Sequence, residues 1–264
     1  SRRQRQMCIR DSYYGGQYFA VFLTKLSHTK VELTYNLMRT FVAGLAFAMP
    51  FSLVYQMMSD RMKGLQKSEK VIKGLPFAAG FTAGTAVSIA GNMHYVIYAQ
   101  IIPLIEKLTG REVSSYWFPD ATRYIGYNPY REEDRTIHEF PCYSFVLGDL
   151  HAHVVNIMFV LLVIALLYVW LRGVRKKTVP VEISMKDGKF WKEQLLMPHL
   201  LVISVLLGMF QWTNFWDFVI YYVVTLGTVL FVNIIRFQGK IKKIIVVTFA
   251  PVSYTHLRAH ETLM

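Results

Sequence analysis

Apolar residues in this chain gather into long runs that polar and charged residues separate. Five runs are close to the ~20 residues of helix that cross the hydrocarbon core of a bilayer. They cover residues 37–58, 75–98, 154–171, 195–212 and 218–235, and a sixth begins at residue 244. Because only helices and closed barrels satisfy the backbone inside lipid, this pattern predicts an all-α, polytopic helical membrane protein with about five transmembrane helices. A soluble helical bundle is the alternative.

Three local features refine this picture. Residues 15–26 carry apolar side chains at near-helical spacing but are too short to span, which predicts a short interfacial helix. The glycines between Gly80 and Gly91 predict a small-residue surface on which helices pack. Pro50 lies inside the first run, where we expect a kink.

Both ends of the chain look like translated sequencing adapters. Residues 2–12 read Arg-Arg-Gln-Arg-Gln-Met-Cys-Ile-Arg-Asp-Ser, and residues 252–262 read Val-Ser-Tyr-Thr-His-Leu-Arg-Ala-His-Glu-Thr. We therefore expect residues 1–12 and 252–264 to be adapter-derived and residues 13–251 to be one membrane-domain fragment of a longer protein. The alternative is a genuine basic arm and a polar tail. Without the adapter-like segments the net charge falls from +12 to +9, and Cys142 is the only cysteine left.

The positive charge is concentrated in three loops. The loops after the first, third and fifth runs hold 16 Lys and Arg residues against five acidic residues. The positive-inside rule places these loops in the cytoplasm and the remaining loops on the extracytoplasmic side of a multi-pass cell-membrane protein. A nucleic-acid partner would need a basic face with interleaved aromatic residues on a soluble surface, which the pattern does not provide. The expected partner is therefore the lipid bilayer.

The long outer segment, from about residue 100 to residue 153, carries a first polar constellation. The string Thr136-Ile-His-Glu-Phe-Pro-Cys-Tyr-Ser-Phe-Val-Leu-Gly-Asp-Leu-His-Ala-His153 brings Glu139, Asp149, His151 and His153 to the mouth of the third run. Carboxylate and imidazole groups are common ligands of zinc and manganese, so Asp149, His151 and His153 are candidate ligands of a divalent metal. The plainer interpretation is that Asp149 caps a helix. Ionisable residues at membrane depth nevertheless usually mark function.

A second constellation joins the fourth and fifth runs. The string Gln211-Trp-Thr-Asn-Phe-Trp-Asp217 predicts a tight outer turn, so that Asn214 and Asp217 face the same side of the membrane as Asp149. An aromatic belt accounts for the two tryptophans. It does not account for Asp217, because strongly apolar residues follow it directly. Weaker signals are Tyr13-Tyr14-Gly15-Gly16 and Tyr35-Asn36.

Together these motifs resemble the "YYY" integral membrane proteins of archaea and bacteria, a family of unknown function. The segments that carry the resemblance are Tyr13-Tyr14-Gly15, Tyr35-Asn36-Leu37, the string from Glu139 to His153, and Thr213-Asn-Phe-Trp-Asp217. Only two tyrosines of the family's triplet stand here, and the acidic segment expected upstream is missing. Such proteins look like polytopic GT-C-like glycosyltransferases, an assignment that transfers by analogy of fold.

The resemblance implies an extracytoplasmic site that uses a polyprenyl-phosphate sugar donor. Asp149, Glu139 or Asp217 would act as general base on the acceptor. His151 and His153 would hold a metal or contact the phosphate of the donor. The residues expected to contact substrate are Tyr14, Asn36, Asn214 and Trp216. Two alternatives remain: a metal-dependent membrane hydrolase built on Asp149, His151 and His153, and a non-enzymatic transporter or envelope scaffold.

Overall fold

The computed structural model describes residues 14–63, 65, 68–127, 129–176, 188–238 and 240–250. Throughout these ranges the regular structure is helical, without a strand, which confirms the prediction of an all-α protein. The adapter-like segments 1–12 and 252–264 lie outside the described residues.

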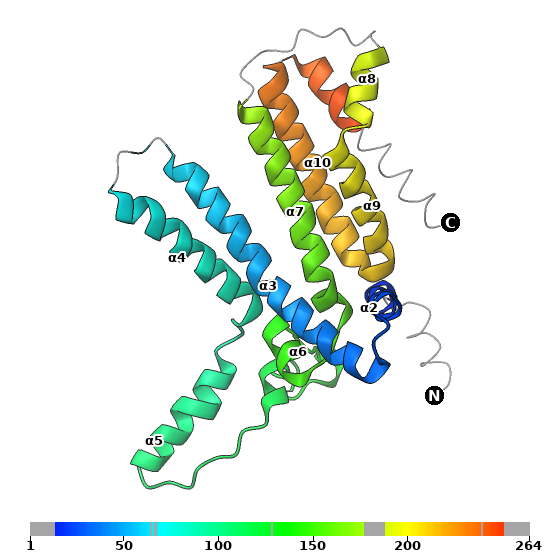
Figure 1. Ribbon diagram of the computed structural model, residues 1–264. Coiled ribbons are helices and arrows are strands. Elements are labelled where there is room, and N and C mark those ends of the chain that lie inside the picture. The colour runs from blue at the N-terminus through cyan, green and yellow to red at the C-terminus, as the bar shows by residue number, and fades with distance from the viewer. Residues whose placement is uncertain are drawn as a thin grey trace. The chain divides into compact units, whose positions relative to one another are not determined.

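The chain folds as a succession of helices (Figure 1). The longer helices are α2 (Tyr14–Ser27), α3 (Val31–Met62), α4 (Glu69–Ser88), α7 (Ala152–Lys176), α9 (Pro198–Thr213) and α10 (Phe215–Phe237). The shorter ones are η1 (Val96–Ile101), α5 (Ile102–Leu108), η2 (Phe118–Thr122), η3 (Glu132–Asp134), α6 (Pro141–Leu147) and α8 (Gly188–Leu195). Residues 241–250 are helical as well.

Three of the described helices are long and apolar enough to cross a membrane. Their most apolar windows have mean hydropathies of 1.6 in α3, 2.8 in α7 and 2.2 in α10. The predicted spans 37–58, 154–171 and 218–235 lie within these three helices. α9 is apolar too, but its 16 residues extend over only ~24 Å, which is less than the ~30 Å of a bilayer core.

The predicted span 75–98 is not one continuous helix. α4 ends at Ser88, and helical structure resumes only after Met93. In the intervening turn the side-chain amide of Asn92 donates a hydrogen bond to the carbonyl oxygen of Ala121 (2.5 Å), and the Phe140 ring lies against Gly91. The break therefore lets this apolar run contact the loop that follows it, which an uninterrupted helix would not do.

α4 carries the small-residue surface that its glycines predict. Gly80, Gly84 and Ser88 are buried and recur every four residues, so they share one face of the helix. A Cβ atom on Gly80 would lie 2.8 Å from the backbone oxygen of Phe51 in α3. The close approach of α4 to this part of α3 therefore requires a glycine.

The chain divides into two compact units. The first unit comprises Ser1–Met49 and Leu150–Met264, and the second comprises Pro50–Asp149. In the first unit α7, α9 and α10 lie side by side (Figure 1) and bury an aliphatic and aromatic core. The buried core side chains include Val163, Ile203, Leu207, Phe210, Phe218, Val229 and Val232.

The direction of each helix in the first unit follows from the contacts at its ends. Asn214 alone joins α9 to α10, and a hydrogen bond joins Asn156 near the start of α7 to Asp217 near the start of α10. α7 and α10 therefore begin at the end where α9 finishes. Their basic C-terminal residues lie at the opposite end, where the guanidinium of Arg236 donates to the side-chain oxygen of Gln194 in α8 (2.8 Å).

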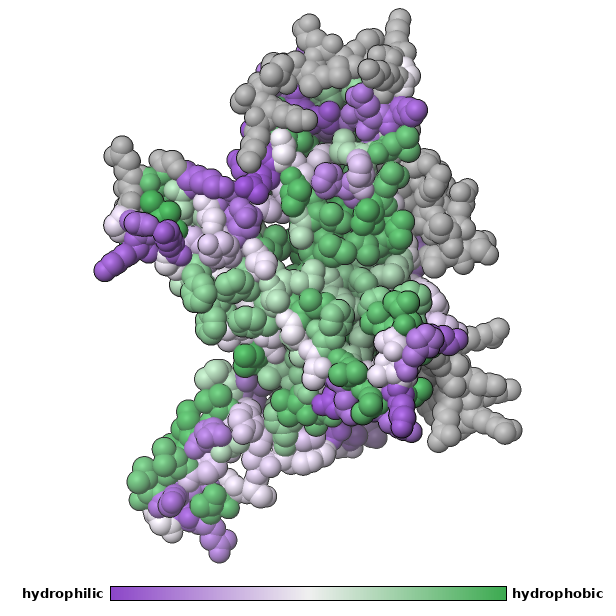
Figure 2. Space-filling view, in the orientation of Figure 1, coloured by the Kyte–Doolittle hydropathy of each residue, from purple (hydrophilic) through white to green (hydrophobic). Residues whose placement is uncertain are grey.

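Hydropathy changes from one end of these helices to the other. Figure 2 shows apolar residues over the middle of α7, α9 and α10 and hydrophilic residues gathered above them, around α8. An apolar band bounded by polar residues is what a bilayer requires of the surface that contacts it.

Candidate functional site

Four polar side chains form a connected network at one end of the first unit. The side-chain amide of Asn156 donates to Oδ2 of Asp217 (2.5 Å), and that of Asn214 donates to the same oxygen (2.9 Å). The hydroxyl of Thr213 donates to Oδ1 of Asn156 (2.9 Å). Asn156 has no exposed surface and Thr213 only 2%, whereas Asp217 and Asn214 are half-buried. The network therefore reaches from the core to the surface.

Local sequence places these groups together. Asn214 has extended backbone angles, ends α9 and precedes α10, so residues on both sides of it face the same end of the bundle. Asp217 lies in the first turn of α10, where the helix dipole favours a negative charge. The backbone N–H groups of Asp217 and Phe218 both donate to the carbonyl oxygen of Asn214, which fixes the turn.

α2 packs directly against this network through its two glycines. A Cβ atom on Gly15 would lie 2.5 Å from Cγ2 of Thr213, and one on Gly16 would lie 2.8 Å from Cγ1 of Val155. Further along α2 the Tyr18 ring packs on Trp212, with ring centroids 5.2 Å apart. The predicted helix at residues 15–26 is confirmed as a helix, and its Gly-Gly pair allows the close approach.

The segment before α7 is held by α3. The backbone N–H of Leu150 donates to the hydroxyl of Tyr35 (3.2 Å). The exposed His151 and the half-buried His153 follow, with ring centroids 5.7 Å apart. Tyr35 thus fixes the start of the segment that carries both histidines, at the same end of the first unit as Asp217.

The other predicted site residues fall at several places. Glu139 and Asp149 belong to the second unit, where Glu139 precedes α6 and Asp149 follows its C-terminal Gly148. Asn36 lies on an exposed turn of α3 and accepts a hydrogen bond from Arg39 (3.1 Å), and Trp216 is 68% exposed. The side chain of Tyr14 lies outside the described part of the chain.

No group of three His, Cys, Asp or Glu side chains that could hold a metal ion occurs among the residues that the structure describes. A metal ion held by protein side chains alone needs about that many ligands. The metal site predicted at Asp149, His151 and His153, and a divalent cofactor with it, stay predictions.

The second unit has an aromatic cluster of its own. His94 stacks on Tyr98 with centroids 4.4 Å apart, and Nδ1 of His94 lies 3.1 Å from the hydroxyl of Tyr116. Burial, followed by the charge of Asp120 and by Tyr95, raises the pKa of Tyr116 above its usual value. The hydroxyl of Tyr116 therefore stays protonated at neutral pH and can donate to the imidazole.

Asn156 is the residue that the sequence pattern did not reveal. It lies within the predicted span 154–171, where the surrounding apolar residues mask a single amide. The available signal was its type, because a fully buried amide has to find partners, and its place on α7 three residues after His153.

The network leaves one carboxylate oxygen, Oδ1 of Asp217, available to a substrate. The hydrogen bonds from the side-chain amides of Asn156 and Asn214 both end on Oδ2, and Oδ1 receives no hydrogen bond from the described residues. A carboxylate with one oxygen anchored and the other available can accept a proton from a bound hydroxyl group. The same bonds also join α7, α9 and α10, as polar side chains do between membrane helices.

Comparison with known proteins gives a family and little else. A family model described as "Uncharacterized membrane protein (DUF2298)" matches residues 9–257. No curated protein and no solved structure matches the chain.

Proposed function

We propose that this chain, which belongs to that uncharacterized membrane protein family, is a glycosyltransferase-like membrane protein with an extracytoplasmic site. In this proposal the donor is a sugar carried on a polyprenyl phosphate. Asp217 acts as the general base that removes a proton from the acceptor hydroxyl. The resemblance to polytopic glycosyltransferases supplies the reaction class, and the network around Asp217 supplies the residue.

One observation carries the choice of Asp217. Its carboxylate is half-buried, its Oδ2 accepts two amide hydrogen bonds, and its Oδ1 receives none from the described residues. Asn156 and Asn214 would hold the carboxylate in one orientation, so Oδ1 would meet a substrate without reorganisation. Asn156 and Asn214 are positioning residues in this proposal.

Charge supports the orientation. The end of the first unit opposite the network carries Arg172, Arg175, Lys192, Arg236, Lys240, Lys242 and Lys243. At the network end, α2, the turn that follows it and the first turns of α3 carry Glu32 and three basic residues, which are Lys25, Lys30 and Arg39. Under the positive-inside rule this charge distribution supports an extracytoplasmic position of the network, which is where the proposed transferase would meet its acceptor.

Replacement of Asp217 by Asn tests the proposal. Asparagine keeps the shape of the side chain and one acceptor oxygen for Asn156, but it cannot take up a proton. We expect transfer from radiolabelled undecaprenyl-phosphate mannose, glucose or arabinose to membrane acceptors to fall about 100-fold or more in Asp217→Asn, as for loss of a general base. Membrane insertion and amount should stay unchanged on immunoblots.

Glu193→Gln is the matched control, because Glu193 is an exposed carboxylate at the other end of the first unit. It should retain full transfer. If Asp217→Asn also retained full transfer, Asp217 would have only the structural role of joining helices.

Asp149 and Glu139 remain predictions for the same role. Asp149→Asn and Glu139→Gln belong in the same assay, and each should transfer sugar at more than a tenth of the wild-type rate if Asp217 is the base. A loss confined to Asp149→Asn would reassign the base to the second unit.

A further inference from the structure

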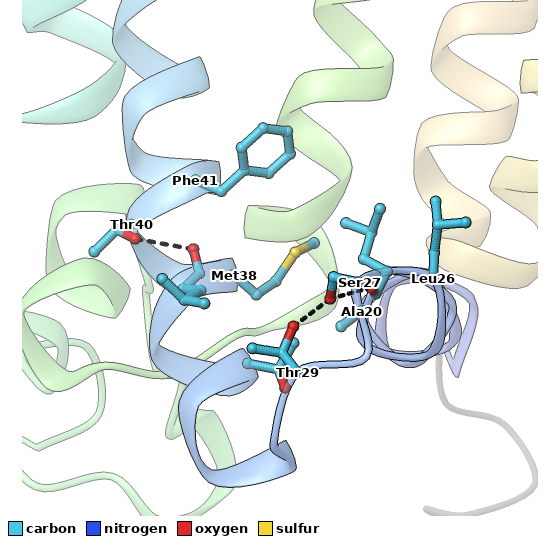
Figure 3. A pocket seen from close by; sticks show the side chains of 10 residues that line it. Ala20, Leu26, Ser27, Thr29, Met38, Thr40 and Phe41 are labelled. Atoms are coloured by element: carbon cyan, nitrogen blue, oxygen red, sulfur yellow. Dashed lines mark hydrogen bonds between the residues drawn. The ribbon is translucent and has the colours of Figure 1, made fainter.

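A cavity of about 570 Å³ lies between α2 and the first turns of α3. Its walls come from Ala20, Leu23, Leu26 and Ser27 of α2, from Thr29, and from Thr34, Leu37, Met38, Thr40 and Phe41 of α3. Figure 3 shows Met38 pointing from α3 toward α2, with Phe41 one turn further along α3. This volume falls within the range of small-molecule sites in proteins.

The polar atoms in the wall are already engaged by the protein. The hydroxyl of Ser27 donates to the carbonyl oxygen of Leu23 (2.7 Å), that of Thr34 to Lys30 (2.8 Å) and that of Thr40 to Leu37 (2.9 Å). Thr29 pairs with Ser27 (Figure 3). Because these groups need no further partner, the cavity presents hydrocarbon to its contents. Water fills such a space poorly, since it needs two to four polar partners.

The surface around the cavity is apolar and solvent-exposed. Val21, Phe22 and Leu26 on α2 are 48%, 59% and 66% exposed, and Leu37 on α3 is 55% exposed. α3 extends over ~48 Å, well beyond the ~30 Å core of a bilayer, so its ends reach the headgroup layer. The cavity therefore lies where a lipid chain can enter it from the membrane.

Basic side chains flank the same segment. Lys25 and Lys30 are exposed on either side of the α2–α3 turn, next to the wall residues Leu26 and Thr29. Arg39 stands between Met38 and Thr40, and Glu32 is the acidic residue of this stretch. This charge complements an anionic headgroup and disfavours a cationic one.

We propose that this cavity holds one acyl chain of an anionic phospholipid whose phosphate contacts Lys25 and Lys30. The acyl chain fills the space between Leu23, Met38 and Phe41. The lipid would brace α2 against α3, next to the glycines that seat α2 on Thr213. The proposal is independent of any sugar transfer, so either can fail alone.

Native mass spectrometry of the full chain tests it. The purified protein receives equal amounts of phosphatidylglycerol and phosphatidylcholine with identical acyl chains, together with undecaprenyl phosphate. We expect one retained phosphatidylglycerol, at least tenfold over phosphatidylcholine. Equal retention of the two phospholipids, or preferred retention of undecaprenyl phosphate, would overturn the proposal.

Two variants separate the contribution of the lipid acyl chain from that of the lipid headgroup. Ala20→Phe fills the cavity and should abolish retention, whereas Lys25→Gln with Lys30→Gln should keep one lipid but lose the preference for phosphatidylglycerol. Lys192→Gln with Lys240→Gln, two exposed lysines elsewhere in the first unit, should behave as wild type. Unchanged retention in folded Ala20→Phe would exclude this cavity.

A fluorescent reporter of lipid binding tests the proposal if Ala20→Phe does not fold. Leu37→Trp places an indole at the mouth of the cavity. Phosphatidylglycerol with brominated acyl chains should quench this added fluorescence more strongly than brominated phosphatidylcholine at equal concentration. Equal quenching would contradict the proposal.

Discussion

At the scale of single residues, Asn156 connects the network. Its amide nitrogen and oxygen bond to side chains on two other helices, Asp217 of α10 and Thr213 of α9. A buried amide that satisfies both of its ends in this way fixes the register of three helices at once. Removing it takes away one of the two amide hydrogen bonds to Oδ2 of Asp217 and the acceptor of the Thr213 hydroxyl, in a region of low dielectric constant.

Asn156→Ala should therefore destabilise the first unit by about 1–2 kcal/mol, a range set by hydrogen bonds in buried and membrane sites. Thermal unfolding in detergent, followed by circular dichroism, measures the loss. Asn36→Ala is the control, because the Asn36 amide is exposed and bonds only to Arg39 nearby. Equal melting temperatures of the two variants would show that the Asn156 network contributes nothing to stability.

Two residues of this network, Asn214 and Asp217, are candidates that the sequence pattern offers. Asn214 and Asp217 stood out because they interrupt apolar runs at a turn. Asn156 did not, since a hydropathy window averages one polar residue into its apolar neighbours, and Thr213 was noted only as part of the string Thr213-Asn-Phe-Trp-Asp217. Which amide meets which carboxylate depends on how α7 is rotated against α10, and that rotation follows from packing of Val163, Phe210 and Val229 across the bundle.

At the scale of elements, the seat of α2 on the bundle depends on Gly15. A Cβ atom there would meet Cγ2 of Thr213 at 2.5 Å and the Thr213 backbone nitrogen at 3.3 Å. Rotation of the Thr213 side chain cannot relieve the clash without breaking the hydrogen bond from its hydroxyl to Asn156. Thr213 thus couples the position of α2 to the network.

Gly15→Ala should cost about 1–3 kcal/mol, as for overpacking of a close contact. Gly44→Ala is the matched control, because nothing lies within 4 Å of a Cβ atom on Gly44 in α3. That variant should be neutral or more stable, since alanine favours a helix by ~1 kcal/mol over glycine. Thermal unfolding of both variants in the same detergent measures the difference. A lower melting temperature for both variants would contradict the packing argument.

Three of the predicted apolar runs each lie within a single helix, and the run at 75–98 does not. The runs at 37–58, 154–171 and 218–235 became α3, α7 and α10. The run at 75–98 is broken, because α4 stops at Ser88 where Gly91 and Asn92 engage Phe140 and Ala121. Those contacts are distant in sequence, so no local pattern encodes them.

At the scale of the whole molecule, the arrangement of charge along α7 and α10 predicts which end of the first unit faces the cytoplasm. The starts of α7 and α10 carry the network, and their ends carry Arg172, Arg175 and Arg236. Two positions report on the two ends of the first unit. Trp216 is 68% exposed beside the network, and Lys192 is exposed on α8.

Labelling with a membrane-impermeant maleimide should distinguish these ends. Cys8 and Cys142 are first replaced by serine, although burial raises the pKa of the Cys142 thiol and so slows its reaction. In intact cells Trp216→Cys should be labelled at once and Lys192→Cys only after permeabilisation. The reverse order would invert the orientation and place Asp217 on the cytoplasmic side.

The one-residue connection between α9 and α10 has a consequence for biosynthesis. α9 has 16 residues, too few to cross the bilayer core, and only Asn214 separates it from the 23-residue α10. A ribosome that has delivered α9 alone has produced a segment that cannot settle across the membrane. We therefore expect the insertion machinery to release α9 and α10 together as a hairpin, with Asn214 at its tip crossing the membrane first.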